Sequence, residues 1–531
     1  MSIRQRDYPE FCKELLAQHN KRWDAERPKL QMLNDAYMSE FYKNKRAFPS
    51  SMIQIEVPEA YSFVEGTLGS LFMSAPGVEI AGDISNSTAD PDVAEAISNR
   101  FLQRKREIFE DAVRLALIFP NSFLKLAPKM TSDPLESVEL CAVEPWNIVV
   151  DDIAYDWDNQ RFVGHQYWMP VPEAKEKYPG RKFTGSYKED YLKPYEQKRQ
   201  DWMPEDFLYV CIFELYDLVN DKLIIYSQHS ENPILSIVPI PLRNWDDTPL
   251  PAIVPLYFSN NPSKPLEGYS SLSRIYDQIT EKNYARTRMA NAVRREARQF
   301  LYQKDKIDDQ ALAGIATGQD GLMIPVEEDN LGALIQPVPN PNVNNDHSLY
   351  LAEIQSDLDR SSMLAPFARG QATQTTATEA MLLQAYTSSE IGRMARRRDT
   401  AIEALVNIYL RMLMIQLPEE QPVVITISDN PSLVLPEHLD GKLNIQVLDG
   451  ASSPFESLQK KQALTSVAGL LVQLGADPQA VLEELVSVYK LPMKLAQKKE
   501  IAQPVRTEAV GQLSEEAISQ LLGPAPGELP Q

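Results

Sequence analysis

The sequence has few of the residues that build disulfides, metal centres and catalytic histidine sites. Its three cysteines, Cys12, Cys141 and Cys211, are far apart in a chain of 531 residues. They form neither a disulfide framework nor a paired zinc motif. The five histidines are scattered as well, which disfavours a histidine-centred site. These absences predict a reduced protein that is made in the cytoplasm.

Long apolar segments are also missing. No apolar run approaches the ~18 residues of a membrane span, and the first residues, MSIRQRDYPEF, show no apolar core of a secretory signal. We therefore expect no membrane association.

The local motifs of nucleotide and hydrolytic chemistry do not occur. The sequence contains no G-x-x-x-x-G-K-[ST] and no G-x-G-x-x-G, the glycine-rich patterns that hold phosphates. It also lacks H-E-x-x-H and G-x-S-x-G. Distant residues can still assemble a triad, so these absences disfavour an enzyme without excluding one. We expect a protein that is not an enzyme and uses no cofactor.

Negative charge dominates the composition. The chain has 53 basic and 74 acidic residues, a net charge of −21. Such a chain is a poor general binder of nucleic acid or of anionic membranes, because like charges repel. It can still surround DNA without gripping it. The content of 43% hydrophobic and 24% charged residues is typical of a folded protein with several lobes.

The spacing of apolar residues predicts an α+β fold. Spacings of three and four residues predict helices in residues 1–45, with an interruption at Pro28, and over 58–73, 90–119, 269–299, 346–363 and 376–417. Short β-rich runs predict strands at 123–126, 148–150, 162–169, 207–215, 223–227, 234–240, 423–427 and 443–447. The tail from 454 to 522 is expected to be helical.

One acidic cluster is dense enough to suggest chemistry. Asp151, Asp152, Asp156 and Asp158 lie within the segment VVDDIAYDWDN. Carboxylates at this density can hold a divalent cation. The glycine that an EF-hand loop requires is absent, and a solvated turn between two strands is the favoured interpretation.

Two groups of basic residues interrupt the acidic pattern. The predicted helix 269–299 carries seven basic and three acidic residues. It is either a face that meets DNA phosphates or an acidic neighbour, or a solvated helix with ion pairs one turn apart. Arg393, Arg396, Arg397 and Arg398 follow in the next long helix. They predict either a phosphate contact or salt bridges to a neighbouring subunit.

Several segments, taken in order, resemble the portal protein, or head-to-tail connector, of tailed double-stranded DNA bacteriophages. The resemblance covers most of residues 50–420. The segments that carry it are SMIQIEVPEAYSFVEGTLGSLFMSAPGVEI (51–80), CAVEPWNIVVDD (141–152), GHQYWMPVPEAKEKYP (164–179), IVPLYFSNNPSKPLEGYSSLSRIYDQITEKNYARTRMANA (253–292) and APFARGQATQTTATEAMLLQ (365–384).

The resemblance implies a portal fold assembled as a ring, usually of twelve subunits. Long stem helices would join a mixed α/β wing to a β-containing clip, with a small helical crown at the far end. The implied parts are an N-terminal wing (1–265), a first stem helix (266–298), the clip (299–345), a second stem helix (346–363), a tunnel loop (364–375), a long helix with the remaining wing (376–453), and the helical crown with the C-terminal tail (454–531).

The resemblance also implies a function and a set of partners. The ring would be a channel at one capsid vertex of the virion, through which double-stranded DNA is packaged and ejected without tight binding. It would be made in the bacterial host cytoplasm. Its partners would be further copies of itself, the terminase packaging motor, the tail adaptor, the major capsid protein and, where one is used, a scaffold protein. ATP hydrolysis would belong to the motor, in keeping with the missing phosphate-binding motifs.

Two sets of candidate site residues follow from the implied parts. The candidates for the DNA tunnel are Arg286, Arg294, Arg295, Arg298, Phe367, Arg369 and Gln371. The clip candidates, which would meet the motor and the adaptor, are Lys304, Lys306, Asp308, Asp309, Glu327 and Glu328.

Two other functions remain open from the sequence. One is a metal-dependent nuclease that uses the cluster of Asp151, Asp152, Asp156 and Asp158. The other is a different structural ring of the head–tail junction, such as a tail adaptor, although adaptors are typically much shorter than this chain.

Overall fold

The chain divides into two compact units, Met1–Pro454 and Phe455–Gln531. The computed structural model describes residues of the first unit only, so the predicted crown and tail lie outside the described residues. The described residues are 7–43, 52–72, 76–82, 89–131, 133–186, 192, 208–259, 268–296, 300–302, 309, 313, 335–337, 345–362, 377–417, 423–427 and 430–447.

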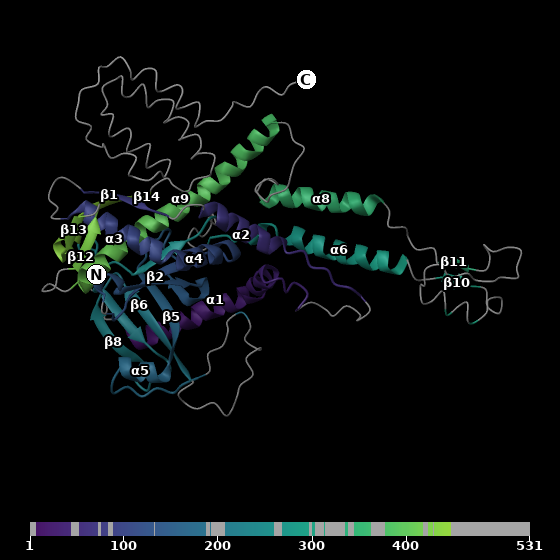
Figure 1. The fold of residues 1–531 in the computed structure, drawn as a ribbon. Coiled ribbons are helices and arrows are strands. Elements are labelled where there is room, and N and C mark those ends of the chain that lie inside the picture. Colours follow the sequence, from purple (N-terminus) through teal and green to yellow (C-terminus); the bar gives the residue numbers. More distant parts are fainter. Residues whose placement is uncertain are drawn as a thin grey trace, which may run out of the picture. The chain divides into compact units, whose positions relative to one another are not determined.

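Two antiparallel sheets organise this unit (Figure 1). The larger sheet has five strands in chain order, β4 (Ile148–Val150), β5 (Phe162–Pro170), β6 (Tyr209–Asp217), β7 (Lys222–Tyr226) and β8 (Ile234–Pro239). The smaller sheet has the order β3 (Val138–Val143), β2 (Ser122–Pro128), β9 (Ile253–Leu256). Three further antiparallel pairs are β1 (Val78–Gly82) with β14 (Leu443–Val447), β10 (Phe300–Tyr302) with β11 (Ile335–Pro337), and β12 (Val423–Ile427) with β13 (Asn430–Val434).

Helices account for most of the remaining described chain, so the protein is a mixed α/β protein. The long helices are α1 (Tyr8–Tyr37), α6 (Tyr276–Glu296), α8 (Asn345–Ser362) and α9 (Ala377–Gln416). The shorter ones are α2 (Glu59–Leu71), α3 (Pro91–Arg104), α4 (Arg106–Ile118) and α5 (Val171–Lys177).

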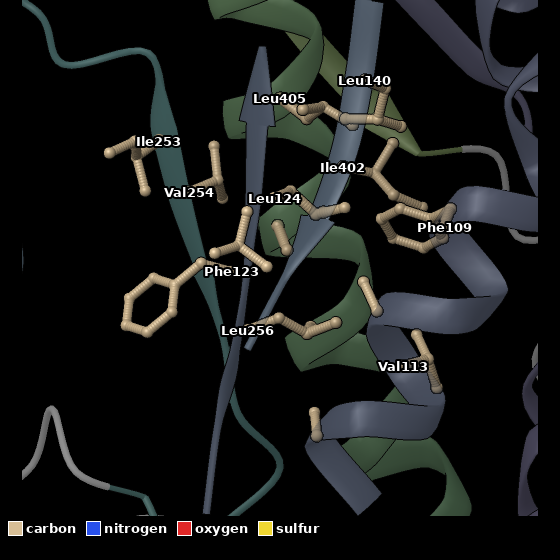
Figure 2. Close-up of a cluster of buried hydrophobic side chains, with 14 of the residues drawn as sticks. Phe109, Val113, Phe123, Leu124, Leu140, Ile253, Val254, Leu256, Ile402 and Leu405 are labelled. Atoms are coloured by element: carbon tan, nitrogen blue, oxygen red, sulfur yellow. The ribbon is translucent and has the colours of Figure 1, made fainter. Parts of the chain in front are cut away.

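The main hydrophobic core lies where α4 and α9 cover one face of the smaller sheet. Alternate residues of a strand point to opposite faces, and Leu124 of β2 points to the helices. Figure 2 shows side chains of both helices gathered on this face, namely Phe109, Val113, Ile402 and Leu405. Leu124, Ile402 and Leu405 are fully buried, and each such burial contributes about 1.5–3 kcal/mol.

Several predicted elements are confirmed. The strands over 423–427 and 443–447 are β12 and β14, and the helices over 346–363 and 376–417 are α8 and α9, each within one residue at both ends. Three predictions about helix limits are wrong, and each has a local cause.

Pro28 does not interrupt the first helix, since it lies inside α1. A proline in a helix interior costs ~3 kcal/mol. Leu30 and Leu33, each 2% exposed, continue the buried face beyond it, and their burial offsets that cost.

The predicted helix over 90–119 is two helices. They meet at Lys105, whose φ of −100° and ψ of 12° leave the helical region, so each helix can turn its own apolar face to the core. The helix predicted from residue 269 begins later, at Tyr276, after a short 3₁₀ turn. Gly268, with φ +62°, precedes it, and a Cβ there would collide with the Pro120 carbonyl oxygen.

A buried ion pair links the two sheets. Lys125 of β2 points away from the α4–α9 core, and its Nζ donates to Glu214 Oε2 of β6 at 2.5 Å and to His165 Nδ1 of β5 at 2.8 Å. The Tyr167 hydroxyl donates to the other Glu214 oxygen at 2.7 Å. Burial alone would raise the pKa of Glu214, but the Lys125 charge and these hydrogen bonds outweigh it and lower that pKa to about 2. Burial, reinforced by Lys125, lowers the pKa of His165 to about 3.

We expect Lys125→Met to destabilise the protein by about 3–5 kcal/mol, because it leaves a buried carboxylate without its partner. Urea unfolding at pH 7 measures this change. The matched control is Lys129→Met, since Lys129 lies 3.7 Å from Glu139 in a pair that is about half exposed and should contribute under ~1 kcal/mol. Equal losses in both variants would contradict a structural role for the buried pair.

His165 and Glu214 should each contribute to a fall in wild-type stability on acidification, alongside the buried His19, whose pKa burial lowers to about 4. His165 and Glu214 both have folded-state pKa values below the ordinary ~6.5 and ~4.3. The unfolded chain therefore binds protons first, and stability is lost between pH ~6.5 and 3 through His165 and between ~4.3 and 2 through Glu214. Unfolding free energies across this range test the prediction, and a His165→Gln variant that keeps the full slope above pH 5 would contradict the His165 assignment.

Candidate functional site

Helices α6 and α8 form an antiparallel pair, which we call the arm (Figure 1). Ile279 of α6 and Ile354 and Leu358 of α8 are each at most 3% exposed, which gives the pair a narrow apolar seam. Lys282 Nζ donates to Gln355 Oε1 at 2.5 Å across the pair. The chain leaves α6 toward β10 and enters α8 after β11, and these two strands pair with each other. The two ends of the segment that joins α6 to α8 therefore lie side by side, on β10 and β11.

Three polar residues fix α6 to a segment far away in the sequence. Asn283, Thr287 and Asn291 lie four residues apart on one side of α6, and we call them the polar ladder. They are 1%, 2% and 8% exposed. The segment 52–57, which we call the strap, passes along this side of the helix.

Each member of the polar ladder accepts one backbone N–H of the strap. Asn291 Oδ1 accepts from the residue 53 amide at 2.9 Å, Thr287 Oγ1 from residue 55 at 3.0 Å, and Asn283 Oδ1 from residue 57 at 2.8 Å. Asn291 Nδ2 and the Thr287 hydroxyl also donate to the carbonyl oxygens of residues 53 and 55, at 2.7 and 3.2 Å. Four helical residues rise ~6 Å and two extended residues span ~6.7 Å, so the two repeats keep the same register.

Neighbouring groups complete this attachment. The Tyr42 hydroxyl donates to the Asn283 carbonyl at 3.0 Å and lies 2.8 Å from Thr287 Oγ1. Lys282 pairs with Glu59 at the start of α2. The arm is thereby tied to the N-terminal helices at its α6 side, through buried polar contacts that have a defined register.

The predicted tunnel residues are only partly covered by the described chain. Arg286 is exposed on α6, and Arg288, two residues on, is exposed too. Neither has a carboxylate partner among the described residues, so the prediction of ion pairs one turn apart fails for these two. The backbones of Arg294 and Arg295 belong to α6, but their side chains lie outside the description, as do Arg298, Phe367, Arg369 and Gln371 altogether.

The predicted clip residues are covered at one position. Asp309 is exposed. The others, Lys304, Lys306, Asp308, Glu327 and Glu328, lie outside the described residues.

The second arginine group serves the chain's own fold. Arg398 is 1% exposed, pairs with Asp399 at 2.6 Å and donates to the Leu71 carbonyl at the end of α2. Arg393 donates to the Phe258 carbonyl at 2.5 Å and pairs with Glu390, one turn away. For these two arginines the prediction of a phosphate or a neighbouring subunit as partner is wrong, because acceptors in the same chain engage them.

Arg396 and Arg397 of this group have different surroundings. Arg396 is exposed. The Arg397 guanidinium lies 5.2 Å from the centre of the Tyr257 ring, a cation–π contact within the chain.

The four clustered aspartates lie in the turn between β4 and β5, as the favoured interpretation had it, but the turn is not solvated at Asp151. Asp151 is buried, and its oxygens accept from Arg161 at 2.9 Å and from the residue 153 amide at 3.1 Å. The hydrogen bond from Arg161 lowers the pKa of Asp151. Asp156 accepts from Asn159 at 2.7 Å.

Because these carboxylates bind different partners, they do not converge on one point where a cation could be held. Asp152 pairs with Arg22 at 2.5 Å, away from the Asp151–Arg161 contact. Among the residues that the structure describes, no three His, Cys, Asp or Glu side chains are grouped as a metal site requires.

Comparison with known proteins adds no assignment. The chain matches no protein-family model and no curated protein. Within its described part, no helix is both long and apolar enough to cross a bilayer. The features that bear on function are therefore the arm, its charges and the resemblance in sequence.

The polar ladder was missed at the level of sequence, although a signal existed. Asn and Thr are unfavourable in helix interiors because they compete for backbone hydrogen bonds. Their repetition at four-residue spacing in a helix without proline or glycine indicates a polar face with a backbone partner.

We expect Thr287→Val to release the strap at its centre. The variant keeps the shape of the side chain but loses the acceptor for the residue 55 amide, which costs about 1–3 kcal/mol when the amide stays buried. Hydrogen exchange of that amide should accelerate by at least about tenfold. Arg286→Ala, an exposed change on the same helix, is the control and should leave the exchange rate unaltered. Unchanged exchange in Thr287→Val would contradict the ladder.

Proposed function

We propose that this chain is a portal protein of a tailed double-stranded DNA bacteriophage. Copies of it would form a ring at one capsid vertex, and DNA would pass through the ring during packaging and ejection. The observation that carries the proposal is the arm. Its two antiparallel helices lead to and return from a segment that begins and ends on the β10–β11 pair, which is the stem-and-clip order that the sequence resemblance implies.

The attachment of the arm supports a mechanical role. A channel wall has to keep its shape while DNA is driven past it. The polar ladder holds α6 through five hydrogen bonds with the strap backbone, and the apolar seam holds α8 against α6. Neither contact needs a ligand, so the arm is already ordered before DNA arrives.

The distribution of charge supports passage rather than binding. DNA affinity grows with each phosphate that a protein neutralises, and strong affinity would slow a sliding duplex. The chain carries a net charge of −21, and the arm exposes a few separate arginines, of which Arg286 and Arg288 are described. An acidic wall with sparse cations repels the duplex from the surface and leaves only weak contacts.

The proposal contains no chemical step in this protein. Energy for packaging would come from the terminase motor, and the clip would contact first the motor and later the tail adaptor. The major capsid protein and a scaffold would surround the ring. The nuclease alternative has no observation in its favour, because Asp151, Asp152 and Asp156 of the β4–β5 turn each bind a separate partner.

Mass photometry of the full chain tests the proposal. Twelve copies of a 60.1 kDa chain amount to about 0.72 MDa, and closed rings near this mass are the expected result. Since assembly can depend on nucleation, the chain is also measured after co-expression with the capsid and scaffold proteins of the same phage. A chain that remains monomeric in both samples would contradict the proposal.

The same particles are then tested for DNA cleavage with Mg²⁺. We expect none. Cleavage that is lost in Asp152→Asn/Asp156→Asn would contradict the assignment and favour the nuclease.

A further inference from the structure

The β4–β5 turn exposes two large apolar side chains, which we call the knob. Ile153 is 82% exposed and Tyr155 is 74% exposed. Burying such side chains contributes about 1.5–3 kcal/mol each, so leaving both in water forgoes a large gain. Neighbouring apolar side chains at such exposure are typical of contact surfaces.

The knob has an acidic surround. Asp152, Asp156 and Asp158 flank the two apolar residues in sequence, and Asp158 is exposed. A surface that receives the knob should therefore combine apolar area with positive charge. The turn is also held by its own contacts, through Asp151 with Arg161 and Asp156 with Asn159, which reduces the entropy lost on docking.

A surface with these properties lies on α6 of the same chain. Arg286, Met289, Ala290 and Val293 follow the spacing i, i+3, i+4, i+7 and so share one side of the helix; we call them the stripe. Val293 is 51% exposed, Met289 and Ala290 are half-buried, and Arg286 is exposed. The polar ladder occupies a different side of α6, and the exposed Arg286 and Val293 keep this part of the stripe open to solvent.

We propose that the knob of one copy docks on the stripe of the next copy. This inference rests on the proposed ring and assigns one of its subunit contacts. Ile153 and Tyr155 are at most ~7 Å apart along the chain, and Met289 and Val293 are separated by one turn, ~6 Å, so the two apolar side chains can span the two stripe positions. The knob acids then face Arg286, which has no carboxylate partner among the described residues.

The two surfaces differ, which determines the type of assembly. A contact between unlike patches is head-to-tail and repeats from copy to copy, so it closes into a ring or extends as a filament. A buried Tyr contributes 150–250 Å² of contact. The knob is therefore a hot spot within a larger subunit interface and does not make up that interface alone.

Assembly of the full chain, measured by mass photometry over a range of concentrations, tests the contact. The knob variant is Ile153→Ser/Tyr155→Ser, and the stripe variant is Arg286→Glu/Val293→Ser. The matched control is Met130→Ser/Val219→Ser, two side chains that are 102% and 49% exposed in other turns. Each test variant should raise the concentration for half-assembly by at least about tenfold, as hot spots do, and the control by less than about twofold.

Combined variants test whether the two surfaces meet each other. If they do, knob and stripe changes together should weaken assembly no more than the stronger change alone, since residues in contact are not additive. Exchanging the charges of Asp158 and Arg286 is a further test, in which assembly should be restored. Asp158→Arg and Arg286→Glu should each weaken assembly, and the two together should restore it toward wild type. Unchanged melting temperatures would show that the exposed substitutions leave the fold intact.

Three results would overturn the inference. Rings that form equally well in the knob variant would exclude the contact and leave the ring proposal standing. Multiplying effects of knob and stripe, with no rescue by the charge exchange, would show that the two surfaces touch different partners. A wild-type chain that never assembles, alone or with capsid and scaffold proteins, would overturn both the contact and the proposed function.

Discussion

The attachment of α6 to the strap is the constraint on which the arm depends. Helix α6 is rich in charged and amide side chains and has only a narrow apolar seam with α8, so apolar burial alone holds it weakly. The hydrogen bonds of the polar ladder provide the additional stabilisation that α6 needs. Asn and Thr lower helix propensity by up to ~0.7 kcal/mol each, while each hydrogen bond returns ~1 kcal/mol net and satisfies a strap amide that would otherwise be costly to bury. The side chains of the polar ladder make the hydrogen bonds that a neighbouring strand would otherwise make with the strap. These hydrogen bonds hold the polar helix α6 in place.

The sheets and α9 form the base from which the arm extends. Leu124 and its neighbours join α4 and α9 to the smaller sheet, and the Lys125–Glu214 pair joins this sheet to the larger one. Arg398 adds a third connection, because its buried guanidinium holds the end of α2, and the start of α2 in turn pairs with Lys282 of α6. A force on the arm would thereby be shared between buried charge pairs and the main core, which suits the proposed role of the chain as a ring subunit.

Much of the fold was predictable where local pattern decides it. The helices α8 and α9 and the strands β12 and β14 follow from periodicity and from flanking prolines such as Pro418. The strands β1 and β9 were missed because their partners are distant, and the pairing of β1 with β14 joins residues more than 350 positions apart. The strands β3 and β13 were also missed, although each pairs with a strand close to it in sequence. The candidate site was likewise predictable only in part. The exposed arginine of the arm was predictable from charge, whereas the polar ladder and the fold-internal role of Arg398 depend on partners that no local spacing reveals.

The most direct test of the central claim is image averaging of the assembled chain by cryo-electron microscopy. The account predicts closed rings in which the α6–α8 arms line a central channel wide enough for duplex DNA, with the strap packed on α6 away from the channel axis. Rings whose arms lie on the outer rim, or assemblies without a continuous channel, would contradict it.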